Sequence, residues 1–238
     1  MGKYVMSSGH GKKVSGANGI LNEVTEARRV VKQVVKYLKE LGETVYEYHD
    51  DTSTTQAQNL RTIVTYHNGK NRDKDFSVHF NAFNGKAGGV EVLHYDSKNK
   101  KDAAALSKVI AKALDLEDRG AKERGKSLAF LRDTNKPALL IEVCFVDNKE
   151  DAEKYNKNFD KMCRAIAEHI AGKQLKEDTE KKPTTTTKKT TTDKNKEKDK
   201  DTNYRIVAGS FSSKDLAQKQ VAELKKKGID SFIDAVKK

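Results

Sequence analysis

Residues 173–203 contain a single apolar residue, Leu175, among 10 lysines and 7 acidic residues. A segment of this composition cannot bury enough apolar surface to offset the entropy of ordering its backbone, so it predicts a flexible, solvated linker. We therefore expect two folded pieces, residues 1–172 and residues 204–238, on either side of that linker. The first piece has the length of one domain, whereas the second is shorter than most domains that fold alone.

The positive charge of the chain suggests a polyanionic partner, because the formal net charge is +12. Residues 1–172 carry 29 Lys and Arg against 24 Asp and Glu, so the excess per residue is greater in the linker and tail. Nucleic acid, anionic lipid and an anionic cell wall all fit that charge. The sequence has no helix-turn-helix, zinc-finger or RNA-binding signature and no apolar run of about 18 residues. We therefore expect neither a nucleic-acid nor a membrane partner.

The opening residues MGKYVMSSGHGKK turn polar too early for a signal peptide. Two cysteines, Cys144 and Cys163, are too few for a disulfide framework. The expectation is a reduced protein made in the cytoplasm.

Strand-like and helix-like segments alternate through the first piece. Apolar residues at steps of three and four predict an amphipathic helix over Asn22–Leu41, and the apolar run ALLIEVCFV predicts a buried strand over Ala138–Val146. The other predicted strands are Lys3–Ser8, Thr44–Tyr48, Asp75–Ala82, Gly89–Tyr95 and Ser127–Leu131, and the other predicted helices are Thr54–Asn68, Asp102–Leu116 and Lys149–Ile170. This alternation predicts an α/β fold with a mostly parallel sheet flanked by helices, which binds ligands beyond the carboxyl ends of its strands.

Four polar residues are candidates for a site at that edge. His10 follows the first strand in SSGHG, His79 lies among apolar residues in FSVHFNA, and Glu142 is the one charged residue of ALLIEVCFV. A buried carboxylate needs compensation, for which a metal ion or its bound water is a candidate. With Glu23, which begins the first long helix, the two histidines would form an open catalytic zinc site. Glu142 would then act as the base.

Each of these residues also has a plainer interpretation. A single histidine is more often a packed or surface residue than a ligand, and Glu23 could simply stabilise a helix N-terminus. Glu26, one turn later, is an alternative ligand. Cys144 is interpreted as a small buried thiol rather than a nucleophile. The remaining histidines are interpreted as surface or packing residues, with His94 the most plausible further ligand: His49, His67, His94 and His169.

Seven segments of the first piece occur in a characteristic order. They are GHG (Gly9–Gly11), GANGILNE (Gly16–Glu23), a single arginine (Arg61), VHFNA (Val78–Ala82), GGVEVLHY (Gly88–Tyr95), RGAK (Arg119–Lys122) and KPALLIEVCFVDNKED (Lys136–Asp151). Because these segments follow one another in the same order as in the family, residues 1–171 resemble the zinc-dependent N-acetylmuramoyl-L-alanine amidases of the type-3 family. The resemblance implies that His10, Glu23 and His79 hold Zn²⁺ and that Glu142 is the catalytic glutamate. In the family an asparagine stands directly before the ligand glutamate, as Asn22 does before Glu23 here, and this favours Glu23 over Glu26.

This chain departs from the family pattern at one place. The family usually carries Asp-Pro directly before GHG, where this sequence has Ser7 and Ser8. The departure concerns contacts around the metal ligands rather than the ligands themselves.

The resemblance also implies a substrate, the amide that joins the lactyl group of N-acetylmuramic acid to L-alanine of the peptidoglycan stem peptide. Zinc would polarise the carbonyl and activate a water molecule, and Glu142 would pass the proton to the leaving amine. The segments RGAK and NKED are closest to phage endolysins, which implies release to the cell wall by a holin. The alternatives are a sporulation or mother-cell autolysin, a wall peptidase and a non-catalytic wall-binding protein.

Residues 204–238 read as a strand, an amphipathic helix and a second strand. This small βαβ module resembles half of a SPOR-type repeat, which binds the glycan strands of peptidoglycan. Because the segment is so short, two copies from two chains could complete one sheet, and we expect a homodimer through residues 204–238. The alternative is a partly folded basic tail held to the wall by its charge.

Overall fold

The structure is a computed structural model of the chain, and it describes residues 1–125, 127–176, 218 and 221–222. The chain divides into two units, Met1–Glu180 and Lys181–Lys238. The helices and strands named below all belong to the first unit. Most of the predicted linker and nearly all of the predicted βαβ module at residues 204–238 lie outside the described residues.

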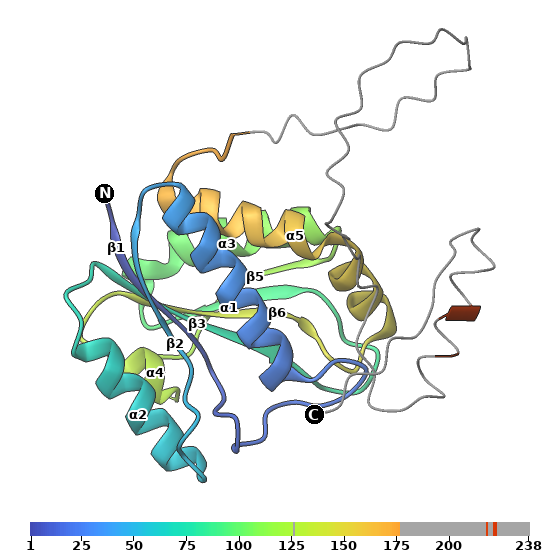
Figure 1. Cartoon of the computed structure of the whole chain (residues 1–238), viewed down its shortest axis with the longest axis horizontal. Helices are drawn as coiled ribbons and strands as arrows, with labels where there is room; N and C mark the ends of the chain where they lie inside the picture. The colour runs from blue at the N-terminus through green and yellow to red at the C-terminus, as the bar shows by residue number, and fades with distance from the viewer. Residues whose placement is uncertain (126, 177–217, 219–220, 223–238) are drawn as a thin grey trace, which may run out of the picture. The chain divides into compact units, whose positions relative to one another are not determined.

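A six-stranded sheet forms the centre of the first unit (Figure 1). The strands are β1 (Lys3–Ser8), β2 (Thr44–Tyr48), β3 (Lys74–Asn81), β4 (Val90–His94), β5 (Asp118–Glu123) and β6 (Ala138–Phe145). They lie in the order β2-β1-β3-β6-β4-β5, and each neighbouring pair is parallel except β4 and β6. The predicted mostly parallel sheet is confirmed.

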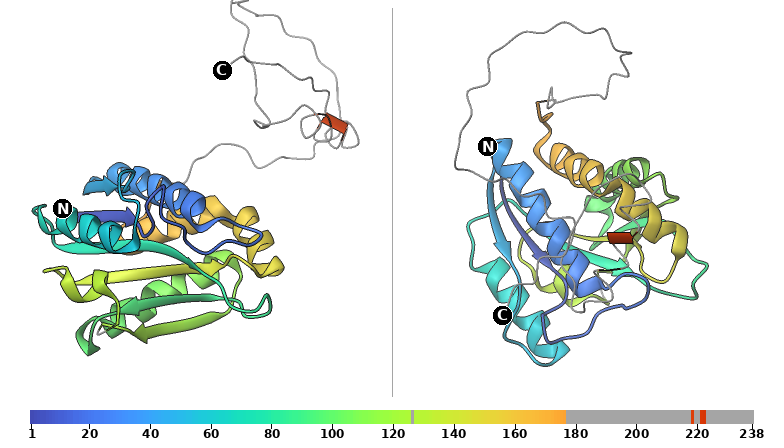
Figure 2. Two further views of the ribbon diagram at one scale, coloured as in Figure 1. Left: turned by 90° about the horizontal axis from the view of Figure 1, so that it is seen from below. Right: turned by 45° about the vertical axis from the view of Figure 1, so that its right-hand side comes forward.

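Helices cover both faces of this sheet. They are α1 (Glu23–Glu40), α2 (Gln56–Asn68), α3 (Ser97–Leu114), α4 (Ala129–Asp133) and α5 (Lys149–Ala171). Successive residues of β6 divide between two apolar clusters: Leu139 and Ile141 pack with α1, α3 and α5, whereas Ala138 and Leu140 pack with α2 and α4. Since neighbouring side chains of a strand point to opposite faces, the two groups of helices cover opposite faces. Figure 2 shows α1 lying along β1 and β2 from two further sides.

The first residues of α1 matter for the site because Glu23 is the helix's first residue. The side chain of Asn22 accepts a hydrogen bond from the backbone N–H of Thr25 at 3.0 Å and so caps the helix. The buried stripe of the helix consists of Ala27, Val30, Val31, Val34, Val35 and Leu38. Cap and stripe together fix the position and rotation of the helix, and with them the backbone of Glu23.

One predicted strand is wrong, because Ser127–Leu131 overlaps the short helix α4 rather than a strand. Phe130 and Leu131 are apolar neighbours that the helix buries against the sheet. The sixth strand is instead β5, which lies at one edge of the sheet and was not predicted from the sequence. Its sequence DRGAKE is largely charged and partly exposed, as is common for edge strands, so it shows no apolar alternation.

Helix α3 also begins earlier than predicted, at Ser97 instead of Asp102. The Asp96 side chain accepts a hydrogen bond from the Lys98 N–H at 3.0 Å and caps the helix there. The first turn, SKNKK, contains no apolar residue, so periodicity could not reveal it. None of the helices among the described residues combines the length and the apolar character that a bilayer span requires.

A buried polar cluster ties α2 to β1 and β3. The fully buried Asp75 accepts hydrogen bonds from Arg72 Nε at 2.8 Å and Nη2 at 2.7 Å, and its Oδ1 lies 2.8 Å from His67 Nδ1. The other ring nitrogen of His67 lies 2.9 Å from Ser7 Oγ. All four groups are paired, so the cluster is compatible with its complete burial. His67 is a packing residue, as predicted.

We expect Asp75→Ala to lower the free energy of unfolding by about 3–5 kcal/mol, because Arg72 would be left buried without its counter-charge. Asp73→Ala is the matched control: Asp73 is exposed and accepts one hydrogen bond, from the Lys3 N–H at 2.8 Å. Its loss should cost less than about 1 kcal/mol. Urea unfolding monitored by circular dichroism measures both, and equal effects of the two substitutions would contradict this account.

Candidate active site

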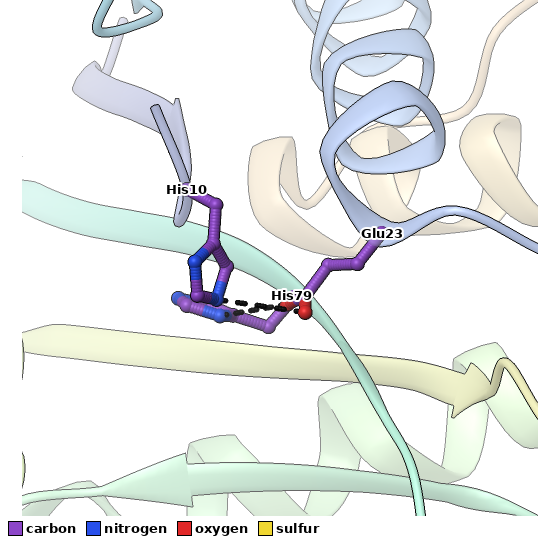
Figure 3. Close-up of side chains that lie close together, drawn as sticks. All are labelled: His10, Glu23 and His79. Carbon is purple, nitrogen blue, oxygen red and sulfur yellow. Dashed lines mark hydrogen bonds and ion pairs between the residues drawn. The ribbon is translucent and has the colours of Figure 1, made fainter. Parts of the chain in front are cut away.

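Three side chains from three separate elements meet beyond the carboxyl ends of β1 and β3. His10 lies in the loop after β1, Glu23 begins α1 and His79 lies near the end of β3. One possible ligand atom from each residue lies within 4.8 Å of the others. Figure 3 shows the three side chains pointing toward one another. The structure thus brings together the three residues that were predicted as metal ligands.

The carboxylate of Glu23 lies between the two imidazoles. Its Oε1 lies 3.1 Å from His79 Nδ1, and its Oε2 lies 3.5 Å from His10 Nε2. Two backbone N–H groups also donate to it, from Phe80 to Oε1 at 3.1 Å and from Ala17 to Oε2 at 2.6 Å. The position of each carboxylate oxygen is therefore fixed by one backbone amide and one histidine.

Glu26, the alternative ligand, takes part in a different set of contacts. Its Oε2 accepts hydrogen bonds from the Tyr155 hydroxyl at 2.7 Å and from Arg29 Nη1 at 3.1 Å. Among the described residues, Glu26 is not a member of the group that could hold a metal ion. The geometry therefore favours Glu23.

Two glycines allow the loops to approach this closely. A Cβ atom added at Gly9 would overlap the ring of His79, and one added at Gly16 would overlap the Glu23 carboxylate and crowd His10. The glycines of GHG and GAN are therefore needed for space at the site.

Glu142 lies directly beside this group. It is the register partner of His79 on the neighbouring strand, so the two side chains share one face of the sheet. Its Oε2 is buried and has no hydrogen-bond partner among the described residues. Burial, opposed by the charge of His79 and supported by the carboxylates of Glu23 and Glu91, raises the pKa of Glu142 to about 7.

The pKa shifts of His10 and Glu23 suit metal binding, whereas that of His79 favours its protonated ring beside two carboxylates. Burial lowers the pKa of His10 despite the Glu23 charge, which favours the neutral imidazole that binds metals. Burial alone would raise the pKa of Glu23, but the hydrogen bond and charge of His79, with the His10 charge and the Ala17 N–H, hold it below its usual value. Burial alone would lower the pKa of His79, but the Glu23 hydrogen bond and the charges of Glu142 and Glu23 raise it.

Two imidazoles and one carboxylate are a donor set that zinc takes in catalytic sites, with a further position left for water or substrate. The orphaned oxygen of Glu142 lies where a general base next to such a site is needed. The residues present therefore fit a zinc ion, although their assignment as ligands stays a prediction.

Three further residues extend the site beyond Glu142, and the sequence analysis assigned them no role. Glu91 on β4 is the register partner of Glu142 on β6. Its Oε1 accepts a hydrogen bond from Asn81 Nδ2 at 3.1 Å, and its Oε2 accepts one from Arg119 Nε at 2.9 Å. All three lie in segments that carried the family resemblance. The signal that could have revealed Glu91 is its position as a charged residue between two buried valines, Val90 and Val92.

Ser7 and Ser8 stand where the family usually has Asp-Pro, and each contacts a histidine outside the candidate metal site. Ser7 contacts His67, and Ser8 Oγ lies 2.9 Å from His49 Nδ1. His94 is buried, and its Nδ1 lies 2.7 Å from the backbone oxygen of Asp96, so it is a packing residue and not a further ligand.

Cys144 is fully buried in the core, and burial raises the pKa of its thiol well above the usual value. A buried, protonated thiol is not a nucleophile. The predicted structural role of Cys144 is confirmed.

The fold and the site define an α/β protein with a candidate metal centre at the carboxyl ends of its parallel strands. The family model for N-acetylmuramoyl-L-alanine amidase (Amidase_3) matches residues 5–172, and the chain belongs to this family. The SPOR domain model matches residues 173–237, a range that includes the predicted linker.

Individual proteins of known sequence or structure are also similar. An uncharacterized protein of Clostridium perfringens is 32% identical over 181 residues, which cover 74% of this chain and 53% of that protein. The endolysin of Bacillus phage SPP1 is 31% identical over 181 residues, covering 72% of this chain and 65% of the endolysin. The solved catalytic domain of the CD27L endolysin targeting Clostridia difficile has a TM-score of 0.68 at 25% identity, covering 74% of this chain and 99% of that domain. The chain spans about half the length of the first curated relatives that it matches.

We expect Glu23→Gln to reduce bound zinc from about one ion per chain to less than about a tenth, since the site loses its anionic ligand. The matched control is Glu26→Gln, three residues further along the same helix, which should keep its zinc. Atomic absorption on the dialysed proteins measures both. Equal zinc contents in the two variants would contradict the assignment of Glu23.

Proposed function

We propose that this chain is a peptidoglycan hydrolase that cleaves the amide between the lactyl group of N-acetylmuramic acid and L-alanine of the stem peptide. The observation that carries the proposal is the group His10, Glu23 and His79 with the unpartnered carboxylate oxygen of Glu142 beside it. The family match over residues 5–172 supports this choice of substrate.

The three ligands would hold zinc, which supplies a Lewis acid that polarises a carbonyl oxygen and lowers the pKa of a ligated water. Glu142 Oε2 is available to accept a proton because none of the described residues forms a hydrogen bond to it. A pKa of about 7 lets the same carboxyl take up a proton and return it to the leaving amine near neutral pH. No serine or cysteine nucleophile is needed, in agreement with the burial of Cys144.

The biological setting we propose is host-cell lysis by a phage endolysin that a holin releases from the cytoplasm. Two of the similar proteins described above are named endolysins, which supports this setting. A sporulation or mother-cell autolysin has the same chemistry and differs in when the enzyme is made. A wall peptidase is the chemical rival, and it would cut within the stem peptide instead.

We expect Glu142→Ala to keep about one zinc per chain but to lower kcat on purified cell walls by roughly 10²–10⁴-fold, because the proton carrier is lost. Release of soluble peptides with time measures the rate. Glu153→Gln, on the exposed face of α5, is the control and should leave the rate unchanged. Normal turnover by Glu142→Ala would refute the proposed mechanism.

We also propose that residues 204–238 bind the glycan strands of the wall and join two chains into a homodimer. The SPOR match over residues 173–237 supports the glycan partner. The basic excess of this part of the chain would strengthen attachment to an anionic wall.

We expect deletion of residues 204–238 to convert a dimer into a monomer and to weaken binding to purified walls. Light scattering coupled to size exclusion gives the mass, and co-sedimentation gives the bound fraction. A truncated chain with the oligomeric mass of the full chain would contradict the dimer proposal.

A further inference from the structure

A row of polar side chains crosses four neighbouring strands beside the candidate metal site. Glu142 on β6 is in register with His79 on β3 and with Glu91 on β4. Arg119, the second residue of β5, continues the row through its hydrogen bond to Glu91. Because β4 is antiparallel to β6 and β5 is parallel to β4, the first residues of these two strands lie at the edge where β3 and β6 end.

The row lies where the apolar covering of this face of the sheet stops. Two positions away on the same face, Leu140 of β6 and Leu93 of β4 are buried in the cluster formed with α2 and α4. In contrast, the Arg119 side chain is 32% exposed and that of Glu91 is 13% exposed. The polar row is therefore open to solvent on the β5 side of Glu142.

The guanidinium of Arg119 is held by two hydrogen bonds and is also partly exposed to solvent. Its Nε donates to Glu91 Oε2 at 2.9 Å and its Nη1 to the Gly88 oxygen at 3.4 Å, while its Cζ lies 5.1 Å from the centre of the Phe145 ring. The other oxygen of Glu91 accepts a hydrogen bond from Asn81, which fixes the carboxylate that orients Arg119. Within the described residues Nη2 makes no hydrogen bond. A guanidinium has five N–H donors. Because that of Arg119 is held in place and has donors left over, it is suited to bind a carboxylate.

The charges around Arg119 indicate which end of the substrate lies there. The carboxylates of Glu91 and Glu142 would repel an anionic ligand, and the guanidinium of Arg119 offsets that repulsion. Near the scissile amide, the muramic acid side of the substrate is neutral. The stem side carries an anion, because the γ-linked D-glutamyl residue after L-alanine has a free α-carboxylate unless it is amidated.

We propose that Arg119 is a specificity-determining residue that binds this D-glutamyl α-carboxylate, so that the stem peptide runs across β6 and β4 toward β5. This inference rests on the proposed function. Two inter-strand spacings separate Glu142 from β5, about 10 Å. Two extended peptide residues span about 7 Å, and the arginine side chain covers the remainder.

The test compares two synthetic muramoyl peptides that differ only at the second stem residue, D-glutamate or D-isoglutamine, with the full chain loaded with zinc. We expect the wild type to prefer the free carboxylate by about tenfold in kcat/KM, mainly through KM. Arg119→Gln should abolish that preference. Arg124→Gln, an exposed arginine after the same strand, is the matched control and should retain it.

The ratio between the two substrates separates recognition from a structural effect. A wild type that cleaves both peptides equally, or an Arg119→Gln variant that slows both while keeping the preference, would overturn the inference and leave the proposed function standing. If neither peptide is cleaved by the wild type, the proposed function fails and this inference with it. Thermal melting checks that Arg119→Gln is folded. If that variant does not fold, Arg119→Lys is tested in its place. Lysine keeps the positive charge but lacks the planar pair of N–H donors, so it should reduce the preference for the free carboxylate to about threefold.

Discussion

The Glu23 carboxylate organises the candidate active site. It is 97% buried, a costly position for a charge, and that cost is offset because two histidines and two backbone N–H groups surround it. These partners come from the single loop between β1 and α1, which holds His10 and Ala17, and from β3, which holds His79 and Phe80. One side chain therefore joins the β1–α1 loop to β3, where His79 lies 56 residues further along the chain than Glu23. A zinc ion would find its donors already close together.

The strand order determines what lies next to that centre. The antiparallel placement of β4 beside β6 brings the beginning of β4 and β5 to the edge where the parallel strands end. Glu91 and Arg119 consequently lie in line with Glu142 and His79. The candidate metal site and the proposed peptide-binding residue thus lie at two ends of one polar row across the sheet.

The sequence predicted most of the fold and the core of the site, because both leave strong local signals. A carboxylate in an apolar run marked Glu142, and helical periodicity marked α1. The edge strand β5 and the short helix α4 could not be found, since a charged edge strand shows no alternation and one buried turn of helix resembles a strand. The pairing of Glu91 with Glu142 and Arg119 depends on strand register, which a single sequence does not specify.

The most direct test of the central claim is to identify the new amino termini that the zinc-loaded chain releases from purified peptidoglycan. The account predicts free amino-terminal L-alanine on sugar-free peptides, without new reducing sugars, and loss of this activity after chelation with recovery on addition of zinc. New amino termini within the stem peptide, or activity that survives complete removal of zinc, would contradict it.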